Sequence, residues 1–534
     1  MMDLLLTTVF DLLGSLMAAG LPTWQLDLSP TVAVAVPLVG AFLIAMAGKW
    51  PNLREATTLI TAAALFWVVI NLTNFLQATP EAELFVDVVP GMPLAFHLEP
   101  LGMIYALIAS SLWILNSIYS IGYMRGNDEK NQTRFYVCFA LSIASVMGIA
   151  FSANMFTLFI FYEALSLATF PLVTHKGTKE ALRSGRTYLG ILMGTSVCLM
   201  LPAMVATYVY CGTLDFTQGG VFAQPLADGV LTPALFGIIF AMYIYGVGKA
   251  ALMPSHRWLP AAMVAPTPVS ALLHAVAVVK AGVFSVLKIS VYIIGVDQLR
   301  LYGQGGWLVY VAGGSIVIAS FIALFQDNLK RRLAYSTISQ LSYITLGAAL
   351  LYPISAAAGA MHIAAHAFGK ITLFFAAGSI YTAAHKTKIS ELDGIGRKMP
   401  WTMGAFTIGT LSMIGLPPTG GFISKWYLMR GAWTAESKFA IAVLCTSTLL
   451  NAAYFLPIVY RAFFKAPPEP EHHDDHGDGH DDHGDGHDDH HDHGEAPWPI
   501  VLALTCTAAA TVVLFFYPNL FAGYADMLAE AMPK

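Results

Sequence analysis

Long apolar stretches recur along the whole chain, and they constrain its fold more than any other feature of the sequence. Many are close to 20 residues long, and a helix of about 20 residues crosses the roughly 30 Å hydrocarbon core of a bilayer. Of the 534 residues 56% are hydrophobic and 11% are charged, whereas a soluble domain carries about 25% charged residues. The sequence has no repeat of alternating ten-residue strands, which disfavours a membrane barrel. It therefore predicts an all-α polytopic membrane protein with about fourteen transmembrane helices.

The predicted helices divide the chain into six parts. The first is an apolar segment that we expect to lie in the membrane interface, because residues 1–20 lack the basic start of a signal peptide and contain Asp3 and Asp11. Helices 1–3, two groups of five helices, a His- and Asp-rich loop and helix 14 follow. In that order the six ranges are 1–30, 31–134, 135–294, 306–463, 466–497 and 498–521.

The basic residues collect in alternate loops of this arrangement. The loops after odd-numbered helices hold Lys49 and Arg54, Arg125 to Arg134, Lys176 to Arg186, Lys330 to Arg332, Lys386 to Lys398, and Arg461 to Lys465. The opposite side holds Arg300, Arg430, Lys438 and Lys534. Because Lys and Arg are enriched in cytoplasmic loops, we expect a multi-pass protein of the cell inner (plasma) membrane. Both termini then lie outside, and the His-rich loop lies in the cytoplasm.

Several charged residues fall inside the apolar segments. Glu163 lies within FIFYEALSLATF, and Lys249, Lys280 and Lys425 lie in other predicted spans. A charge at the bilayer centre costs about 2.5–3.5 kcal/mol on insertion scales, and intramembrane ionisable groups commonly mark ion paths. A static ion pair is the alternative for each of them. Lys288 is near the outer end of its span, so we expect its amine to extend to the interface.

Further titratable residues share one face of a predicted helix. His362, His366 and Lys370 follow each other at intervals of four in MHIAAHAFGKITLFF, which places them in one row. A single histidine could be a hydrogen-bonded core residue, but three titratable groups in a row favour a proton relay, since imidazole passes protons in either direction. His274 in the eighth predicted span adds another such group.

Two predicted spans are long and interrupted. In helix 7 (231–263) Lys249 comes shortly before Pro254, and in helix 12 (401–432) Lys425 follows Pro417-Pro418. A proline break in a bilayer is tolerated only where it is buried in protein or lines a wet cavity. Corresponding broken helices in two halves are typical of inverted-repeat transporters, which bind their ions near the midplane. An ordinary proline kink is the alternative.

Four stretches resemble the antiporter-like membrane subunits of respiratory complex I and the Mrp-type sodium/proton antiporters. They are FYEALSLATF around Glu163, KAALMPSHRWLPAAMVAPTPVSALLHAVAVVKAGVF from Lys249, DNLKRRLAYSTISQLSYI from Asp327, and LSMIGLPPTGGFISKWYL around Lys425. The resemblance covers about residues 98–463. It implies fourteen helices in which helices 4–8 and 9–13 form two inverted five-helix repeats, with helices 7 and 12 broken.

The resemblance also implies a role for each charged residue. Glu163 and Lys249 match the family's paired glutamate and lysine of helices 5 and 7, and Lys425 matches the charged residue of helix 12. His274 and Lys280 match helix 8, and His362, His366 and Lys370 lie where helix 11 connects the two half-channels. One departure is Thr187-Tyr188 in helix 6, where many relatives have Lys-Tyr.

Together these features predict a proton-translocating subunit without covalent catalysis. Opening of the Glu163–Lys249 pair would release a proton toward Lys425. In its length and in Lys425 the chain is most similar to the D-type subunit of an Mrp antiporter, which implies other subunits, H⁺, Na⁺ and the bilayer as partners. A proton-pumping subunit of complex I or of another redox- or uptake-driven complex is the alternative, and a scaffold subunit without ion flux is a third. No cofactor is expected, because the five cysteines have no CxxC spacing.

The loop between helices 13 and 14 stands outside this family pattern. Residues 472–493 read HHDDHGDGHDDHGDGHDDHHDH. This composition predicts weak binding of Zn²⁺ or Ni²⁺, proton buffering, or a solvated linker. The candidate metal ligands are His472, His473, His476, His480, His483, His487, His490, His491 and His493.

Overall fold

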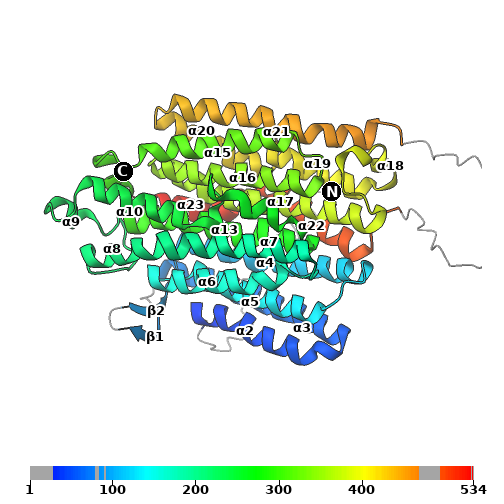
Figure 1. The fold of residues 1–534 in the computed structure, drawn as a ribbon, viewed down its shortest axis with the longest axis horizontal. Helices are drawn as coiled ribbons and strands as arrows, with labels where there is room; N and C mark the ends of the chain where they lie inside the picture. Colours follow the sequence, from blue (N-terminus) through cyan, green and yellow to red (C-terminus); the bar gives the residue numbers. More distant parts are fainter. Residues whose placement is uncertain (1–27, 79–82, 90–91, 468–493, 531, 533–534) are drawn as a thin grey trace, which may run out of the picture.

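The computed structural model describes residues 28–78, 83–89, 92–467, 494–530 and 532. Its long helices run side by side along the longest axis of the molecule, and two short strands lie at one end (Figure 1). We call this the hairpin end. The opposite end holds the helix ends and connections that contain Lys49, Lys176 and Lys398, and we call it the basic end.

The first part of the bundle reaches from α2 to α14. Its helices and strands are α2 (Pro30–Met46), α3 (Pro51–Leu72), β1 (Glu83–Val89), β2 (Met92–Phe96), α4 (Pro100–Gly126), α5 (Gln132–Ala150), α6 (Met155–Val173), α7 (Lys179–Thr195), α8 (Leu201–Cys211), α9 (Ala223–Ala227), α10 (Pro233–Gly246), α11 (Trp258–Ala261), α12 (Thr267–Ala271), α13 (Val278–Lys288) and α14 (Val296–Leu301). Short π-helical segments join α7 to α8 (Ser196–Met200), join α12 to α13 (Leu272–Val276) and follow α13 (Ile289–Ile294).

The second part reaches from α15 to α23. Its helices are α15 (Gly306–Leu324), α16 (Leu329–Ala349), α17 (Pro353–Ala384), α18 (Ile395–Lys398), α19 (Pro400–Ile414), α20 (Gly420–Thr434), α21 (Lys438–Phe464), α22 (Trp498–Phe516) and α23 (Asn519–Glu530). In the described residues, eleven helical spans are long and apolar enough to cross a membrane. The predicted class, an all-α polytopic membrane protein, is therefore confirmed, whereas the count of fourteen and the two inverted repeats stay predictions.

Proline and capping residues fix where many helices begin. Pro30, Pro100 and Pro353 each occupy the first position of a helix, where the missing N–H costs no hydrogen bond. The side chain of Asn154 accepts a hydrogen bond from the backbone N–H of Thr157 at 2.8 Å and so caps α6. These local signals set the ends of the helices, while the apolar faces between them supply the packing.

Two spans form the interior of the bundle. The span Thr267–Ile294, which includes α12 and α13, and α17 are enclosed by other helices over their most apolar windows. Helices such as α2 and α8 instead leave large apolar side chains exposed, as expected of surfaces that face lipid. The interior spans carry six of the titratable residues singled out above, namely His274, Lys280, Lys288, His362, His366 and Lys370.

Both predicted helix breaks are present. The first follows α10, where Ala251 adopts a left-handed φ of 53° and the indole of Trp258 donates to the carbonyl of Gly248 at 3.0 Å. A Cβ atom at Gly282 of α13 would lie 2.2 Å from the backbone nitrogen of Ala250, so a glycine is needed for α13 to approach this break. The second break lies between α19 and α20, where Gly415 has a φ of 90°.

Two features near the hairpin end differ from the sequence analysis. Strands β1 and β2 pair antiparallel, with Glu83 opposite Phe96, whereas the sequence analysis predicts no strand. The predicted last helix, 498–521, is two helices, because α22 ends before Pro518 and α23 continues from Asn519. Proline removes a backbone donor, which explains the interruption.

Candidate functional site

Seven of the eight residues predicted to carry protons lie inside the bundle or have their polar atoms enclosed. The side chains that are at most 1% exposed are Lys249, His274, Lys280, His362, His366 and Lys370. Glu163 is partly exposed, but neither of its carboxylate oxygens reaches the surface. Lys425 is half-buried.

The predicted contact between Glu163 and Lys249 is not made in this structure. The Lys249 ammonium donates to the backbone carbonyl of Tyr162 at 2.7 Å and lies 3.2 Å from the centre of the Tyr162 ring. The backbone N–H of Lys249 also donates to the Tyr162 hydroxyl at 3.1 Å. Both Glu163 carboxylate oxygens have no hydrogen-bond partner among the described residues, although the carboxylate still interacts electrostatically with Lys249. Glu163 and Lys249 are therefore neighbours in an open arrangement.

Lys280 and His366 form a hydrogen bond between α13 and α17. The Lys280 amine lies 2.5 Å from Nδ1 of His366, and both side chains are fully buried. His274 lies in the π-helical segment before α13, where its ring packs against Phe374 with centroids 4.9 Å apart. Neither ring nitrogen of His274 has a hydrogen-bond partner within the part of the chain that the structure describes. His274 is thus near this pair without being bonded to it.

His362 connects α17 to α16 and α20. Its Nδ1 lies 2.9 Å from the Ser424 hydroxyl, and its Nε2 lies 3.0 Å from Oε1 of Gln340. The ring centres of His362 and His366 are 6.1 Å apart on successive turns of α17. The Gln340 amide in turn donates to the backbone carbonyl of Met413 at 3.3 Å. Uncharged side chains therefore continue the row of histidines toward the second helix break.

Lys425 lies at that break. Its ammonium donates to the carbonyls of Met413 at 2.5 Å and Ile414 at 3.2 Å, and it lies 4.8 Å from the centre of the Tyr343 ring. These carbonyls are the last ones of α19, and the C-terminus of a helix attracts a positive charge. The broken helix therefore supplies the site that holds Lys425.

A chain of close polar contacts thus leads from Lys280 to Lys425. It runs through His366, His362, Gln340 and the Met413 carbonyl, and the two histidine rings are its one step without a hydrogen bond. Lys370 lies to one side, where it donates to the Ser336 hydroxyl at 2.7 Å. No hydrogen bond joins Lys249 to Lys280 among the described residues.

Sequence analysis missed the uncharged residues that contact the titratable groups of this path. Tyr162, Gln340, Ser424 and Ser336 are common residue types in helices, so composition gives no reason to single them out. All four do lie within stretches quoted above, and this is the one signal that could have identified them: FYEALSLATF contains Tyr162, DNLKRRLAYSTISQLSYI contains Ser336 and Gln340, and LSMIGLPPTGGFISKWYL contains Ser424. In the Thr187-Tyr188 pair, which differs from the Lys-Tyr of many relatives, the Tyr188 hydroxyl is hydrogen-bonded to the Thr169 hydroxyl of α6 at 2.6 Å.

The expectation that Lys288 extends to the interface is wrong. Its side chain is fully buried and forms an ion pair with Glu99 at 2.7 Å. It also donates to the backbone carbonyl of Ser152 at 2.6 Å. Lys288 turns inward because a carboxylate at the start of α4 offers a better partner than the headgroup region.

The predicted metal ligands, His472 to His493, lie outside the described residues, as does the apolar segment 1–20. Within the described ranges no group of three or more His, Cys, Asp or Glu side chains is placed to hold a metal ion. Binding of Zn²⁺ by the His-rich loop stays a prediction from composition.

Comparison with known proteins gives one consistent family. The sequence profile described as "NADH:quinone oxidoreductase/Mrp antiporter, TM" matches residues 152–450, more than half of the chain. Over 455 residues the chain is 31% identical to NADH-quinone oxidoreductase subunit N of Desulforudis audaxviator, covering 83% of this chain and 87% of that protein. It is 29% identical to a subunit of a probable K(+)/H(+) antiporter of Rhizobium meliloti, covering 82% of this chain but 44% of that protein.

Solved structures share the fold. A chain of the Mrp complex from Dietzia sp. aligns with a TM-score of 0.81 at 21% identity, covering 95% of this chain and 98% of that chain. A chain of an archaeal membrane-bound sulfane sulfur reductase aligns with a TM-score of 0.78 at 22% identity, covering 94% and 97%. The chain spans about half the length of several other relatives, such as hydrogenase-4 component B of Escherichia coli, of which it covers 52%. The chain belongs to the family of NADH:quinone oxidoreductase and Mrp antiporter transmembrane subunits.

Proposed function

We propose that this chain is a proton-translocating subunit of a multi-subunit Mrp-type sodium/proton antiporter. Protons would move along the buried axis from Glu163 and Lys249, through Lys280 and the α17 histidines, to Lys425. The observation that carries this proposal is the chain of contacts from Lys280 to Lys425, which involves α13, α17, α16, α19 and α20.

The charge balance of the axis supports transport rather than a static network. Among the described residues, Lys249, Lys280, Lys370 and Lys425 form no ion pair with a carboxylate. A buried ammonium without a counter-ion is costly. A structural ion-pair network places opposite charges together, whereas this axis holds amines and imidazoles that accept and release protons. Such groups suit proton transfer from one to the next.

The contacts around Glu163 and Lys249 support the proposal that these two residues form a switch at one end of the axis. Glu163 has a buried carboxylate without hydrogen-bond partners, and the Lys249 ammonium is held by a neighbouring carbonyl. When the pair closes, Lys249 is held charged by its counter-ion. When the pair opens, as here, that stabilisation is lost and the proton can move toward Lys280. His274 and Lys370 would adjust the field along this path without being links in it.

The proposal also assigns this subunit to an Mrp complex rather than to another complex of the same family. The Mrp-complex chain from Dietzia sp. supports it by fold, and Lys425 supports it by residue type. A proton-pumping subunit of complex I or of another redox-driven complex is the second candidate, and the match to subunit N over 87% of that protein favours it. Purification from native membranes separates the two: small Mrp-type partners support the first, and quinone-reducing or iron–sulfur partners support the second.

Orientation and location follow from the charged loops. We propose that the basic end faces the cytoplasm and the hairpin end faces outside, in the inner membrane of the cell, because lysines and arginines collect at the basic end. The fourteen crossings and the groups 135–294 and 306–463 as inverted repeats belong to the same proposal.

Proton transport along the axis is tested with Lys280→Met in the complete complex. We expect sodium-driven proton movement in everted vesicles to fall to background, because Lys280 is the link between α13 and α17. Lys388→Met is the control, since the Lys388 side chain is 60% exposed. Exchange at the wild-type rate in Lys280→Met would contradict the proposed function.

A further inference from the structure

A cavity of about 820 Å³ lies at the hairpin end, lined by residues of the first part of the bundle and of α23. Its rim is exposed and includes Asp215 and Glu530, while its floor is buried and includes Glu99 and Ser152. His97 and Tyr292 also line it, so the titratable groups that face the cavity are one histidine, one tyrosine and three carboxylic acids. At about 30 Å³ per molecule of liquid water, this volume holds many waters.

The floor of the cavity is one half of a buried ion pair. Glu99, which is 7% exposed, precedes the first residue of α4 and contacts Lys288 of α13. The Lys288 ammonium is fully enclosed by Glu99, the Ser152 carbonyl and the Phe216 ring, whose centre is 4.3 Å away. A purely structural pair would explain this contact. Such a pair would not explain why its carboxylate lines a cavity that reaches the surface.

Lys288 also lies in line with the proton axis. Lys280, Phe284 and Lys288 follow each other at intervals of four on α13, so they share one face. The two lysines are separated by eight residues, or about 12 Å along the helix. Lys280 contacts His366 of the axis, and Lys288 contacts the cavity floor. The helix therefore places one amine at each side of Phe284.

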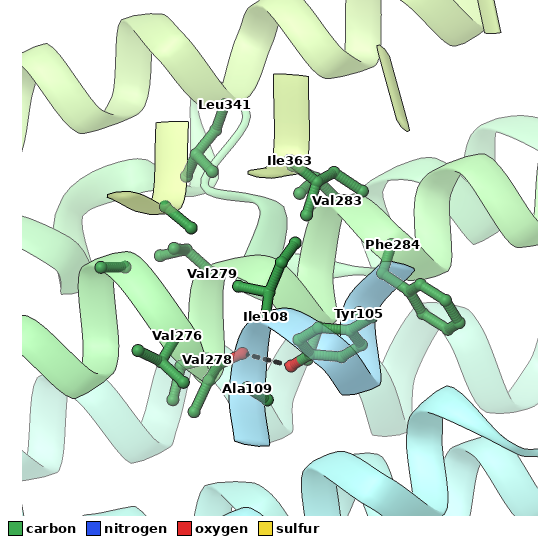
Figure 2. Close-up of a cluster of buried hydrophobic side chains, with 14 of the residues drawn as sticks. Tyr105, Ile108, Ala109, Val276, Val278, Val279, Val283, Phe284, Leu341 and Ile363 are labelled. Carbon is green, nitrogen blue, oxygen red and sulfur yellow. Dashed lines mark hydrogen bonds between the residues drawn. The ribbon is translucent and has the colours of Figure 1, made fainter. Parts of the chain in front are cut away.

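Phe284 closes the space between the two amines. Its ring is fully buried, packs against Tyr105 of α4 with centroids 5.1 Å apart, and lies 5.5 Å from the Lys288 ammonium. Figure 2 shows both rings in an apolar cluster with Val283, Ile108 and Ile363. The Tyr105 hydroxyl donates to the Ala277 carbonyl at 2.8 Å, so it is held away from this gap. An apolar constriction of this kind blocks ions as long as water is excluded.

We propose that Glu99 and Lys288 form a second proton-transfer site, which connects Lys280 to the outer cavity whenever the Phe284 ring moves aside. The Lys288 ammonium gives a proton to the Glu99 carboxylate, and the neutral carboxyl releases it to cavity water. The neutral Lys288 amine then takes a proton that water carries from Lys280 past the displaced ring. The proton axis thereby has an outer opening near Lys288, in addition to its end at Lys425. This inference rests on the proposed proton transport.

The first test uses the complete complex in vesicles. Glu99→Gln/Lys288→Met removes both charges and preserves the size of both side chains, so neither partner is left buried alone. We expect exchange to fall at least about tenfold, which corresponds to about 1.4 kcal/mol in the barrier. An assembled double variant that exchanges at the wild-type rate would overturn the inference. If Lys280→Met also exchanged normally, the proposed function itself would fail, and this distinguishes the two outcomes.

The second test measures passive proton leak, which a purely structural pair would not support. Phe284→Ala should raise the leak through vesicles held at a proton gradient, because water then enters the gap. Adding Glu99→Gln should abolish that leak, since the proton acceptor at the cavity floor is lost. Phe406→Ala, which truncates a fully buried phenylalanine of α19, controls for loosened packing. A leak that persists with Glu99→Gln, or an equal leak in Phe406→Ala, would overturn the inference. If Phe284→Ala does not assemble, Phe284→Leu replaces it with the same two criteria.

Discussion

The Lys249 ammonium binds the backbone carbonyl of Tyr162 at 2.7 Å, one residue before the glutamate that the sequence analysis gave it as a partner. Tyr162 and Glu163 are adjacent residues of α6. A modest movement of the lysine side chain would therefore exchange the Tyr162 carbonyl for the Glu163 carboxylate. The Tyr162 ring, 3.2 Å from the ammonium, stabilises the charge in this position. Two alternative partners for one buried amine are what a switch requires.

Glu163→Gln should abolish exchange while the protein still inserts and assembles. The glutamine keeps the size of the side chain but cannot hold Lys249 in a closed ion pair, so the switch loses one of its two states. We expect sodium-driven proton movement in everted vesicles to fall at least about tenfold.

Glu180→Gln is the matched control for this variant. Glu180 is exposed in the first turn of α7, so its charge has no access to the axis. Near-normal exchange in Glu163→Gln, with assembly confirmed, would remove the switch from the proposal.

Lys425→Ala should block transport, and Lys425→Glu should retain part of it. Alanine removes the group at the end of the contact chain, so the Met413 and Ile414 carbonyls both lose the Lys425 ammonium as a donor. A glutamate offers an exchangeable proton at the same break, although the helix terminus of α19 disfavours its negative charge.

The rate of exchange in vesicles measures this effect, with Lys438→Ala as the control. Lys438 is an exposed lysine at the start of α21. If Lys425→Ala exchanged as fast as Lys438→Ala, the end of the path would have to lie elsewhere.

Charged residues in apolar segments made much of this site predictable. Glu163 was expected inside an apolar span, and it lies in α6, which covers Met155–Val173. Both helix breaks could be located because proline and glycine act on the backbone itself. Contacts between helices could not be predicted, because they depend on how helices rotate against each other. Glu99, which precedes α4, therefore gave no sign that it pairs with Lys288, and Gln340 gave no sign that it bridges His362 to α19.

Gln340→Leu should slow transport because it removes the bridge between His362 and the Met413 carbonyl. A leucine has similar volume but neither accepts nor donates, so His362 loses its contact toward the second break. The loss of one hydrogen bond to a charged or charge-carrying group is worth about 1.5–3 kcal/mol, which corresponds to roughly 10- to 150-fold in rate.

Gln340→Glu restores an acceptor at this position and should recover part of the rate, which a simple packing defect would not do. Gln326→Leu is the control, since the Gln326 side chain donates to the Ile322 carbonyl of its own helix end and takes no part in the contact chain. Equal rates for Gln340→Leu and Gln326→Leu would show that protons bypass Gln340.

The free energy of unfolding should fall as the pH is lowered, because His175 in the loop after α6 is buried in its neutral form. Burial, together with the positive charge of Arg134, lowers the pKa of His175 from 6.5 to about 4. Between these two values the unfolded chain binds a proton that the folded chain does not. The contribution to stability is therefore fully present above pH 6.5 and is lost progressively as the pH falls toward 4, by up to about 3 kcal/mol. The Glu129 carboxylate, 3.9 Å from Nε2 of His175, partly opposes this effect.

The midpoint of thermal unfolding of the purified protein, measured at several pH values between 4 and 7, tests this expectation. Wild type should lose stability over this range, and His175→Gln should show a shallower slope because glutamine does not titrate. His385→Gln, which replaces an exposed histidine at the end of α17, should keep the wild-type slope. Identical slopes for His175→Gln and wild type would show that another group sets the acid sensitivity of the fold. A shallower slope for His385→Gln would assign that sensitivity to the surface of the basic end.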